Sequence, residues 1–137
     1  MSCKSAIYTV NNSGTTVTTT AGTFVQVPFG SIVRRFGDSV KLDGDSILCC
    51  NSGYFDVEIS MSLTPVAAGT VTIQLYQDGV AVPGALATIT VPAVSTTETF
   101  PITALIRNYG CNCGSVLTVR INASATINNF ATVVEKL

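Results

Sequence analysis

Five cysteines carry most of the reactive chemistry that this sequence offers. Cys49 and Cys50 are adjacent, Cys111 and Cys113 are separated by one residue, and Cys3 lies alone near the start. Neither close pair has the Cys-x-x-Cys spacing of ordinary zinc sites. Three interpretations stay open for the four paired residues: thiolate ligands of a metal, a disulfide, or free thiols buried as small apolar side chains. Cys3 is expected to be unpaired.

Asp56 and Glu58 are spaced as a pair of carboxylates on an expected strand. Residues two apart on a strand point the same way, about 7 Å from each other, within the roughly 5 to 9.5 Å of paired glycosidase carboxylates. Such pairs are also common on wet strand faces. The sequence contains no His, which removes imidazole acid–base chemistry and His-activated nucleophiles. We therefore predict a solvated or subunit-facing pair, and no enzyme.

A second acidic motif is the short segment Asp43-Gly44-Asp45. Two carboxylates in a turn resemble part of a calcium loop, but a calcium cage needs about six or more oxygen ligands. The segment is better explained as a turn between two strands. No cofactor is expected from any motif of the sequence.

The elements that position these residues are strands. Residues 53–63 and 69–76 alternate apolar and polar side chains, and Asp78-Gly79 follows as a hairpin turn. The apolar members are expected to build the core: Phe55, Val57, Ile59, Val71, Ile73 and Leu75. Further strands are expected over 6–10, 24–27, 32–33, 40–42, 47–50, 87–91, 99–107, 116–122 and 130–137. The Thr-rich stretch 15–23 is either linker or strand. This pattern predicts an all-β sandwich or barrel.

The composition points to self-association. The chain has 137 residues, so we expect a single domain over 1–137 with residues 1–5 as a short lead. Hydrophobic residues make up 47% and charged residues 11%, with a mean hydropathy of +0.47. Typical soluble domains have about 25% charged residues. Part of this apolar surface is therefore expected to be covered by other copies of the chain.

Charge and hydropathy also exclude some partners. The net charge is −1, and Arg34 and Arg35 form the one basic pair, so nucleic acid is not an expected partner. No stretch has the roughly 18 to 20 apolar residues that a membrane span requires. The segment 1–6 lacks the apolar core of a secretory signal. We expect a protein that is either made and kept in a cytoplasm, or that leaves it by cell lysis or as part of a particle.

Several segments of the chain resemble complement globular heads and tumour-necrosis-factor-like domains. They are Gly44, Ile47 and 53–57, the strand and turn 75–80, the step 113–117 and the closing strand 129–134. The resemblance covers roughly residues 30 to 137. It implies a two-sheet antiparallel jelly roll that forms a homotrimer through one largely apolar sheet. A collagen-like stalk, Trp and recognisable calcium ligands are missing from this sequence, so calcium binding and vertebrate-type ligands are not carried over.

The implied fold makes a prediction about the cysteines. The strand that begins at Gly53 should pair antiparallel with the strand that ends near Arg107. Residues just before the first strand then lie beside residues just after the second. We therefore expect the pair at 49–50 to meet the pair at 111–113 at one end of the molecule.

The resemblance also suggests a function. Short stand-alone versions of this fold look like proteins of bacteriophages and gut bacteria. The leading hypothesis is a non-enzymatic, trimeric virion component that contacts a capsid or tail protein: capsid decoration, head fibre or fibre tip. The alternative is an adhesive domain of a tail fibre or cell surface that binds a cell-surface glycan. A glycan platform would use tyrosines, of which Tyr109 is expected to be the most exposed among Tyr8, Tyr54, Tyr76 and Tyr109.

Overall fold

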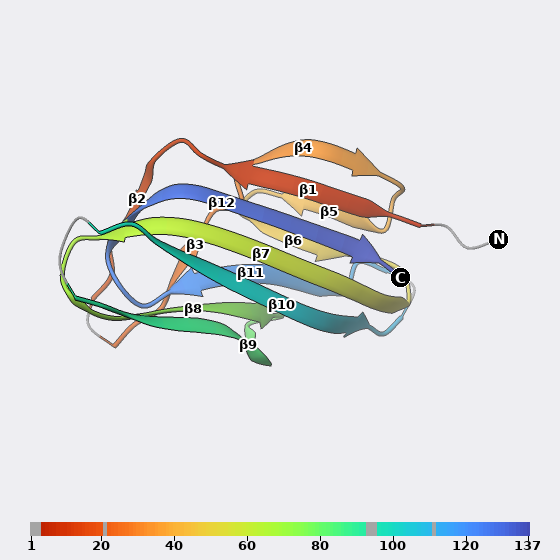
Figure 1. Cartoon of the computed structure of the whole chain (residues 1–137). Coiled ribbons are helices and arrows are strands. Elements are labelled where there is room, and N and C mark those ends of the chain that lie inside the picture. Colours follow the sequence, from red (N-terminus) through yellow and green to blue (C-terminus); the bar gives the residue numbers. More distant parts are fainter. Residues whose placement is uncertain (1–3, 21, 93–95, 111) are drawn as a thin grey trace.

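The computed structural model describes residues 4–20, 22–92, 96–110 and 112–137, and they form a sandwich of two β-sheets (Figure 1). No helix is present among them, so no helix in that part of the chain could cross a membrane. The twelve strands are β1 (Ala6–Asn11), β2 (Thr15–Val17), β3 (Val25–Val27), β4 (Ser31–Phe36), β5 (Val40–Asp43), β6 (Ser46–Cys49), β7 (Gly53–Pro65), β8 (Gly69–Gln77), β9 (Val80–Val91), β10 (Glu98–Asn108), β11 (Ser115–Ile121) and β12 (Ala125–Lys136).

Each sheet is antiparallel and contains six strands. Sheet A has the order β10-β7-β12-β1-β4, with β2 beside β12. Sheet B has the order β5-β6-β11-β8-β9, with β3 beside β11. Neighbours in space are mostly distant in sequence, because the chain crosses repeatedly from one sheet to the other. This arrangement confirms the predicted two-sheet jelly roll.

The central strand β7 shows how sequence alternation becomes a sheet with two different faces. Its side chains at 55, 57, 59, 61 and 63 are buried, and those at 54, 58 and 60 are exposed. One edge of β7 pairs with β10 and the other with β12. Arg107 lies opposite Tyr54, which confirms the predicted pairing of the strand that begins at Gly53 with the strand that ends near Arg107.

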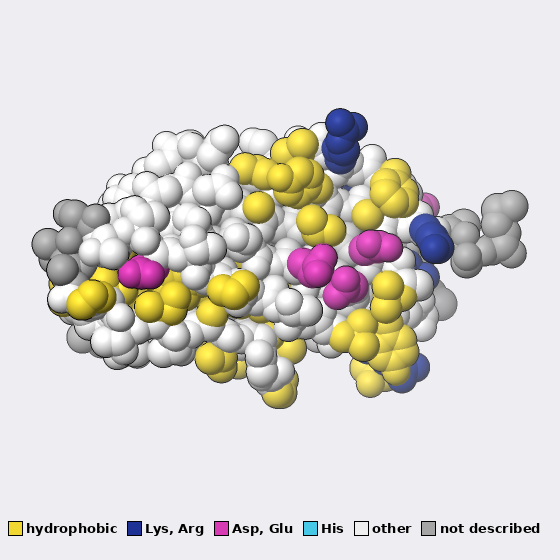
Figure 2. All heavy atoms as spheres, viewed as in Figure 1, with side chains coloured by type: hydrophobic (Ala, Val, Ile, Leu, Met, Phe, Trp, Pro, Cys, Tyr) yellow, Lys and Arg dark blue, Asp and Glu magenta, His cyan; other side chains and the backbone are white. Residues whose placement is uncertain are grey.

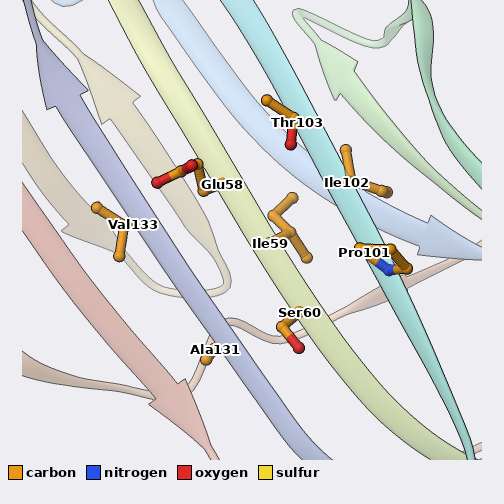
Figure 3. Close-up of a pocket in the computed structure, with 8 residues that line it drawn as sticks. All are labelled: Glu58, Ile59, Ser60, Pro101, Ile102, Thr103, Ala131 and Val133. Carbon is orange, nitrogen blue, oxygen red and sulfur yellow. The ribbon is translucent and has the colours of Figure 1, made fainter.

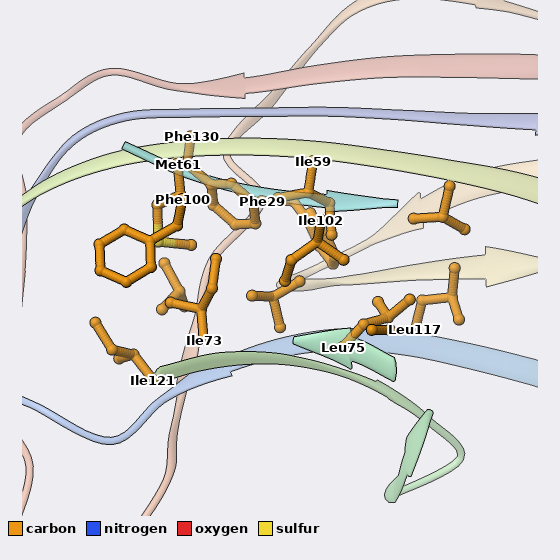
Figure 4. Close-up of a cluster of buried hydrophobic side chains, with 14 of the residues drawn as sticks. Phe29, Ile59, Met61, Ile73, Leu75, Phe100, Ile102, Leu117, Ile121 and Phe130 are labelled. Atoms are coloured by element: carbon orange, nitrogen blue, oxygen red, sulfur yellow. The ribbon is translucent and has the colours of Figure 1, made fainter. Parts of the chain in front are cut away.

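The hydrophobic core fills the space between the two sheets (Figure 4). All six side chains predicted for it are at most 4% exposed. Aromatic rings that the sequence pattern did not single out complete it. The Phe29 and Phe130 rings stack with their centroids 5.3 Å apart, and each is at most 1% exposed. The core therefore joins both sheets into one unit.

Turn residues explain where several strands end. Asp78 and Gly79 have positive φ angles of 54° and 80°, as a two-residue hairpin turn of type I′ requires, and they connect β8 to β9. Gly44 also has a positive φ, of 59°, in the turn between β5 and β6. Gly30, with φ of 93°, passes so close to the Val10 carbonyl that any side chain would overlap it. This close contact fixes the chain's entry into β4.

Several strands are longer than the sequence predicted, β4, β9 and β12 most of all, and β4 covers Ser31–Phe36 where only 32–33 was expected. β9 begins at Val80, directly after the hairpin turn, although the sequence predicted a strand only over 87–91. A bulge between the positions of Gln74 and Tyr76 takes up the irregularity in the β8–β9 pairing. β12 begins at Ala125, five residues before the expected start. Within the Thr-rich stretch, 15–17 forms β2.

Candidate functional site

The outer face of sheet A carries three carboxylates at its centre. Asp56 and Glu58 both project from β7, and Glu135 on β12 lies directly opposite Asp56. Figure 2 looks onto this face and shows acidic side chains gathered among hydrophobic ones. No ion pair compensates them among the residues that the structure describes, and like charges directly opposite in a sheet repel each other. Positive charge from outside the chain would therefore stabilise this face.

These acids do not form a recognisable catalytic or metal site. Glu58 is exposed and Asp56 is half-buried, so neither is enclosed as an acid–base group usually is. Within the described residues, no group of three or more acidic or thiol side chains is placed to hold a metal ion. The sequence missed Glu135, because only the register of β12 against β7 brings residues 79 positions apart side by side.

A shallow hollow of about 270 Å³ lies beside the acids (Figure 3). Eight residues line it, with the small side chains of Ser60 and Ala131 among them: Glu58, Ile59, Ser60, Pro101, Ile102, Thr103, Ala131 and Val133. Ligand pockets usually measure roughly 300–1,000 Å³, so this hollow suits one inserted side chain better than a cofactor. The face is also more polar than the resemblance implied, because carboxylates interrupt its apolar surface.

Two of the cysteines meet at the end of the molecule where β6, β7, β10 and β11 begin or end. Cys50 and Cys113 form a disulfide; their Cα atoms are 3.8 Å apart and they are 63 positions apart in sequence. This confirms that the segment before β7 lies beside the segment after β10. Cys3 and Cys111 lie outside the described residues. A metal site of four thiolates stays a prediction, and it would require Cys50 and Cys113 to be reduced.

A buried hydrogen-bond network holds the two bridged segments together. The Asn108 amide, 1% exposed, donates to the carbonyls of Asn51 (2.8 Å) and Asn112 (3.1 Å). Its oxygen accepts a hydrogen bond from the Ser115 hydroxyl at 2.8 Å. Gln77 donates to that same hydroxyl at 3.0 Å. The disulfide therefore joins segments that already hold each other through well-satisfied polar contacts.

Cys49 is adjacent to the disulfide in sequence but faces the core. It is fully buried and free. Burial, with a smaller contribution from the Asp78 charge, raises the pKa of the Cys49 thiol from 9.0 to about 12. Since the thiolate is the reactive form, this thiol is unreactive in the folded protein.

The raised pKa of Cys49 predicts an alkaline loss of stability. Above pH 9 an unfolded chain releases the thiol proton, whereas the folded chain retains it until about pH 12. The contribution of the buried, protonated Cys49 thiol to the free energy of unfolding is therefore fully present below pH 9, and it is lost as the pH rises towards 12. Urea unfolding at pH 8 and pH 10 should show a smaller decrease for Cys49→Ala than for the unaltered chain. Equal decreases would contradict the assignment.

An exposed aromatic cluster lies at the same end as the disulfide. The Arg107 guanidinium stacks over the Tyr109 ring at 4.4 Å and lies 5.3 Å from the centroid of Tyr54. Tyr109 is 73% exposed, which makes it the most exposed tyrosine, as predicted. Tyr76 instead packs against Phe24, and Tyr8 lies on β1. The cluster is thus an aromatic and cationic surface that is open to solvent.

The strand order and the packing of the two sheets define a TNF-like jelly roll. Among solved structures, murine APRIL at pH 5.0 matches with a TM-score of 0.74 and 16% identity over 98% of this chain and 99% of that one. The globular domain of zebrafish complement 1qA protein matches with a TM-score of 0.69 and 12% identity, over 98% and 96%. The PRD1 vertex protein P5 matches with a TM-score of 0.66 and 16% identity, over 96% and 72%.

These likenesses establish the fold and nothing more, because all the sequence identities are low. No family model matches the sequence, and no curated protein sequence matches it. The resemblance to complement heads and TNF-like domains is therefore confirmed at the level of structure. Function has to be argued from the surfaces of this chain.

Proposed function

We propose that the protein is a non-enzymatic structural component that assembles as a trimer on the surface of a bacteriophage virion. The observation that carries the proposal is the outer face of sheet A, where exposed apolar side chains surround uncompensated carboxylates and a hollow the size of one side chain. A face of this kind suits contact with other protein chains. The shared fold with TNF-type and complement domains supports three copies as the assembly.

Light scattering coupled to size-exclusion chromatography tests the assembly. We expect a mass of three times 14.3 kDa at micromolar protein concentration, because the low charge content leaves the exposed face of sheet A poorly solvated. Native mass spectrometry should give the same stoichiometry. A monomer throughout the micromolar range would refute the trimer.

The virion location is supported by the structural likeness to the phage vertex protein P5 of PRD1. The disulfide adds a second argument, since disulfides persist where the surroundings are oxidising, as they are for a released particle, and are rare in a cytosol. Purified particles from the source culture should contain the protein when they are banded by density and analysed by mass spectrometry. Recovery with the cell envelope instead would favour the cell-surface alternative.

Binding of a cell-surface glycan is the second candidate function, and the aromatic cluster at Tyr54, Arg107 and Tyr109 favours it. Exposed aromatic rings stack on sugar rings, and the guanidinium suits an acidic sugar. A glycan array should give signals that decrease for Tyr109→Ala and persist for Tyr76→Ala, whose ring lies elsewhere. An array without signals would leave the plain structural role.

A further inference from the structure

β4 is the most exposed strand in the described part of the chain. All six of its residues are exposed, whereas every other strand has at least one residue that is buried or half-buried. Among the described strands it pairs with β1 alone, so no described strand covers its second edge. Three of its six side chains are large and apolar: Ile32, Val33 and Phe36 are 45%, 53% and 58% exposed. Such a strand is poorly suited to remain uncovered in water.

A bulge in β4 determines which of its side chains lie on the outer face of sheet A. Arg34 lies opposite Tyr8 and Phe36 lies opposite Ala6, which both belong to the outer face of sheet A. The register then shifts, and Val33 is the extra residue. In a bulge two residues oppose one on the partner strand, so Val33 stands beside Arg34. The outer side of β4 therefore presents a cation between two apolar side chains. We call Val33, Arg34 and Phe36 the β4 patch.

The positive charge of the β4 patch has no partner within its own subunit. Arg35, its neighbour, donates from Nε to the Val40 carbonyl at 2.7 Å on the inner side. Arg34 makes no ion pair or side-chain hydrogen bond among the described residues. Glu58 lies three strands away in the same row, about 14 Å between backbones, with Tyr8 and Val133 between them.

The complementary surface is on the same sheet. The three acids described above lie on β7 and β12, and the hollow reaches from these strands to β10; among the described residues the acids equally lack a partner. The spacing also matches. Glu58 and Ser60, which both line the hollow, are two residues apart on β7, as Arg34 and Phe36 are on β4, and both intervals measure about 7 Å.

We propose that the β4 patch of one copy docks on the acidic hollow of a second copy of this chain. Arg34 would face the carboxylate of Glu58, with Asp56 and Glu135 nearby, while Phe36 would enter the hollow over Ser60. The occupant is a second copy because each chain carries both halves, basic and apolar at one edge of sheet A and acidic and hollowed towards the other. A head-to-tail contact closes into a ring of three when each subunit is rotated by a third of a full turn relative to the next. The inference rests on the proposed trimer and names its contact.

A charge-exchange experiment tests this contact. Arg34→Glu and Glu58→Arg, each alone, should raise the protein concentration at half-dissociation by at least about tenfold, because a like-charge pair then replaces an attractive one. The double variant Arg34→Glu with Glu58→Arg restores the attraction and should assemble within a few-fold of the unaltered chain. Lys41→Glu, the same charge change on an exposed residue of sheet B, is the matched control and should assemble normally.

The outcomes separate this contact from the trimer itself. The contact would be overturned if the single variants assembled normally, or if the double variant did not recover assembly. If the unaltered chain is still a trimer in that case, the proposed function stands. A monomeric parent chain would overturn both. Should the reversal variants fail to fold by circular dichroism, Arg34→Gln and Glu58→Gln in a double-mutant cycle measure the same coupling. Additive effects in that cycle would equally overturn the contact.

Discussion

Replacing Cys50 and Cys113 together by alanine is expected to lower the free energy of unfolding by about 4 kcal/mol. The disulfide closes a loop of 63 positions that contains β7, β8, β9 and β10. In the unfolded chain this closure removes much of the conformational freedom of four strands, whereas the folded chain already holds the two ends together through Asn108. The cost of losing the bond therefore comes mainly from the unfolded state.

Urea unfolding monitored by circular dichroism, at one fixed protein concentration, measures this effect. The unaltered chain in reductant should match the double variant, and the double variant itself should not respond to reductant. This comparison separates the bond from any packing change at the two substituted positions. If the unaltered chain and the variant unfolded alike without reductant, Cys50 and Cys113 would not be bonded. Metal analysis and thiol titration would then test the thiolate alternative.

Phe130→Ala is expected to destabilise the protein by about 3 to 5 kcal/mol, the usual cost of removing a buried phenyl ring. Phe130 is fully buried on β12, opposite Met61 of β7. Its ring stacks on Phe29 from the segment between β3 and β4 (Figure 4). The substitution removes the apolar area that the ring buries on folding and the contacts of the stacked ring. Because β12 is paired with strands on both sides, the sandwich cannot collapse to fill the cavity.

The same unfolding measurement tests the effect of Phe130. Phe24→Ala provides a control of the same chemistry. Because Phe24 is 39% exposed, this substitution should lower the free energy of unfolding much less. Phe130→Leu should recover part of the loss by refilling the cavity. Equal costs for Phe130→Ala and Phe24→Ala would contradict the assigned core.

The elements of the fold could be predicted well from the sequence, because period-2 alternation and turn chemistry are local. The alternation over 53–63 predicted which side of β7 is buried, and Asp78-Gly79 predicted the hairpin. The local signal missed the part of β9 before residue 87, and it left the Thr-rich stretch undecided, because Thr suits both strand and linker. Pairing with neighbouring strands decided both cases.

The candidate sites were only half predictable. Asp56 and Glu58 were visible as a pair, but Glu135 joins them through strand register, which no local pattern contains. The meeting of the two cysteine segments was predicted once a fold was assumed. Which residues bond, and that Cys49 turns into the core instead, required the structure. The β4 patch could not be predicted either, because the sequence shows Arg34 and Arg35 only as a basic pair and does not show that their strand lies at an exposed edge.

By itself, then, the sequence determined an all-β chain with alternating strands, little charge and no histidine. These properties depend on residue type and spacing along the chain, so they can be read without a fold. Only the tertiary structure decided that Cys50 bonds Cys113, that three acids share the face of sheet A, and that β4 lies exposed at its edge. Each of these depends on which strands are neighbours, and that order is set by the packing of the whole core.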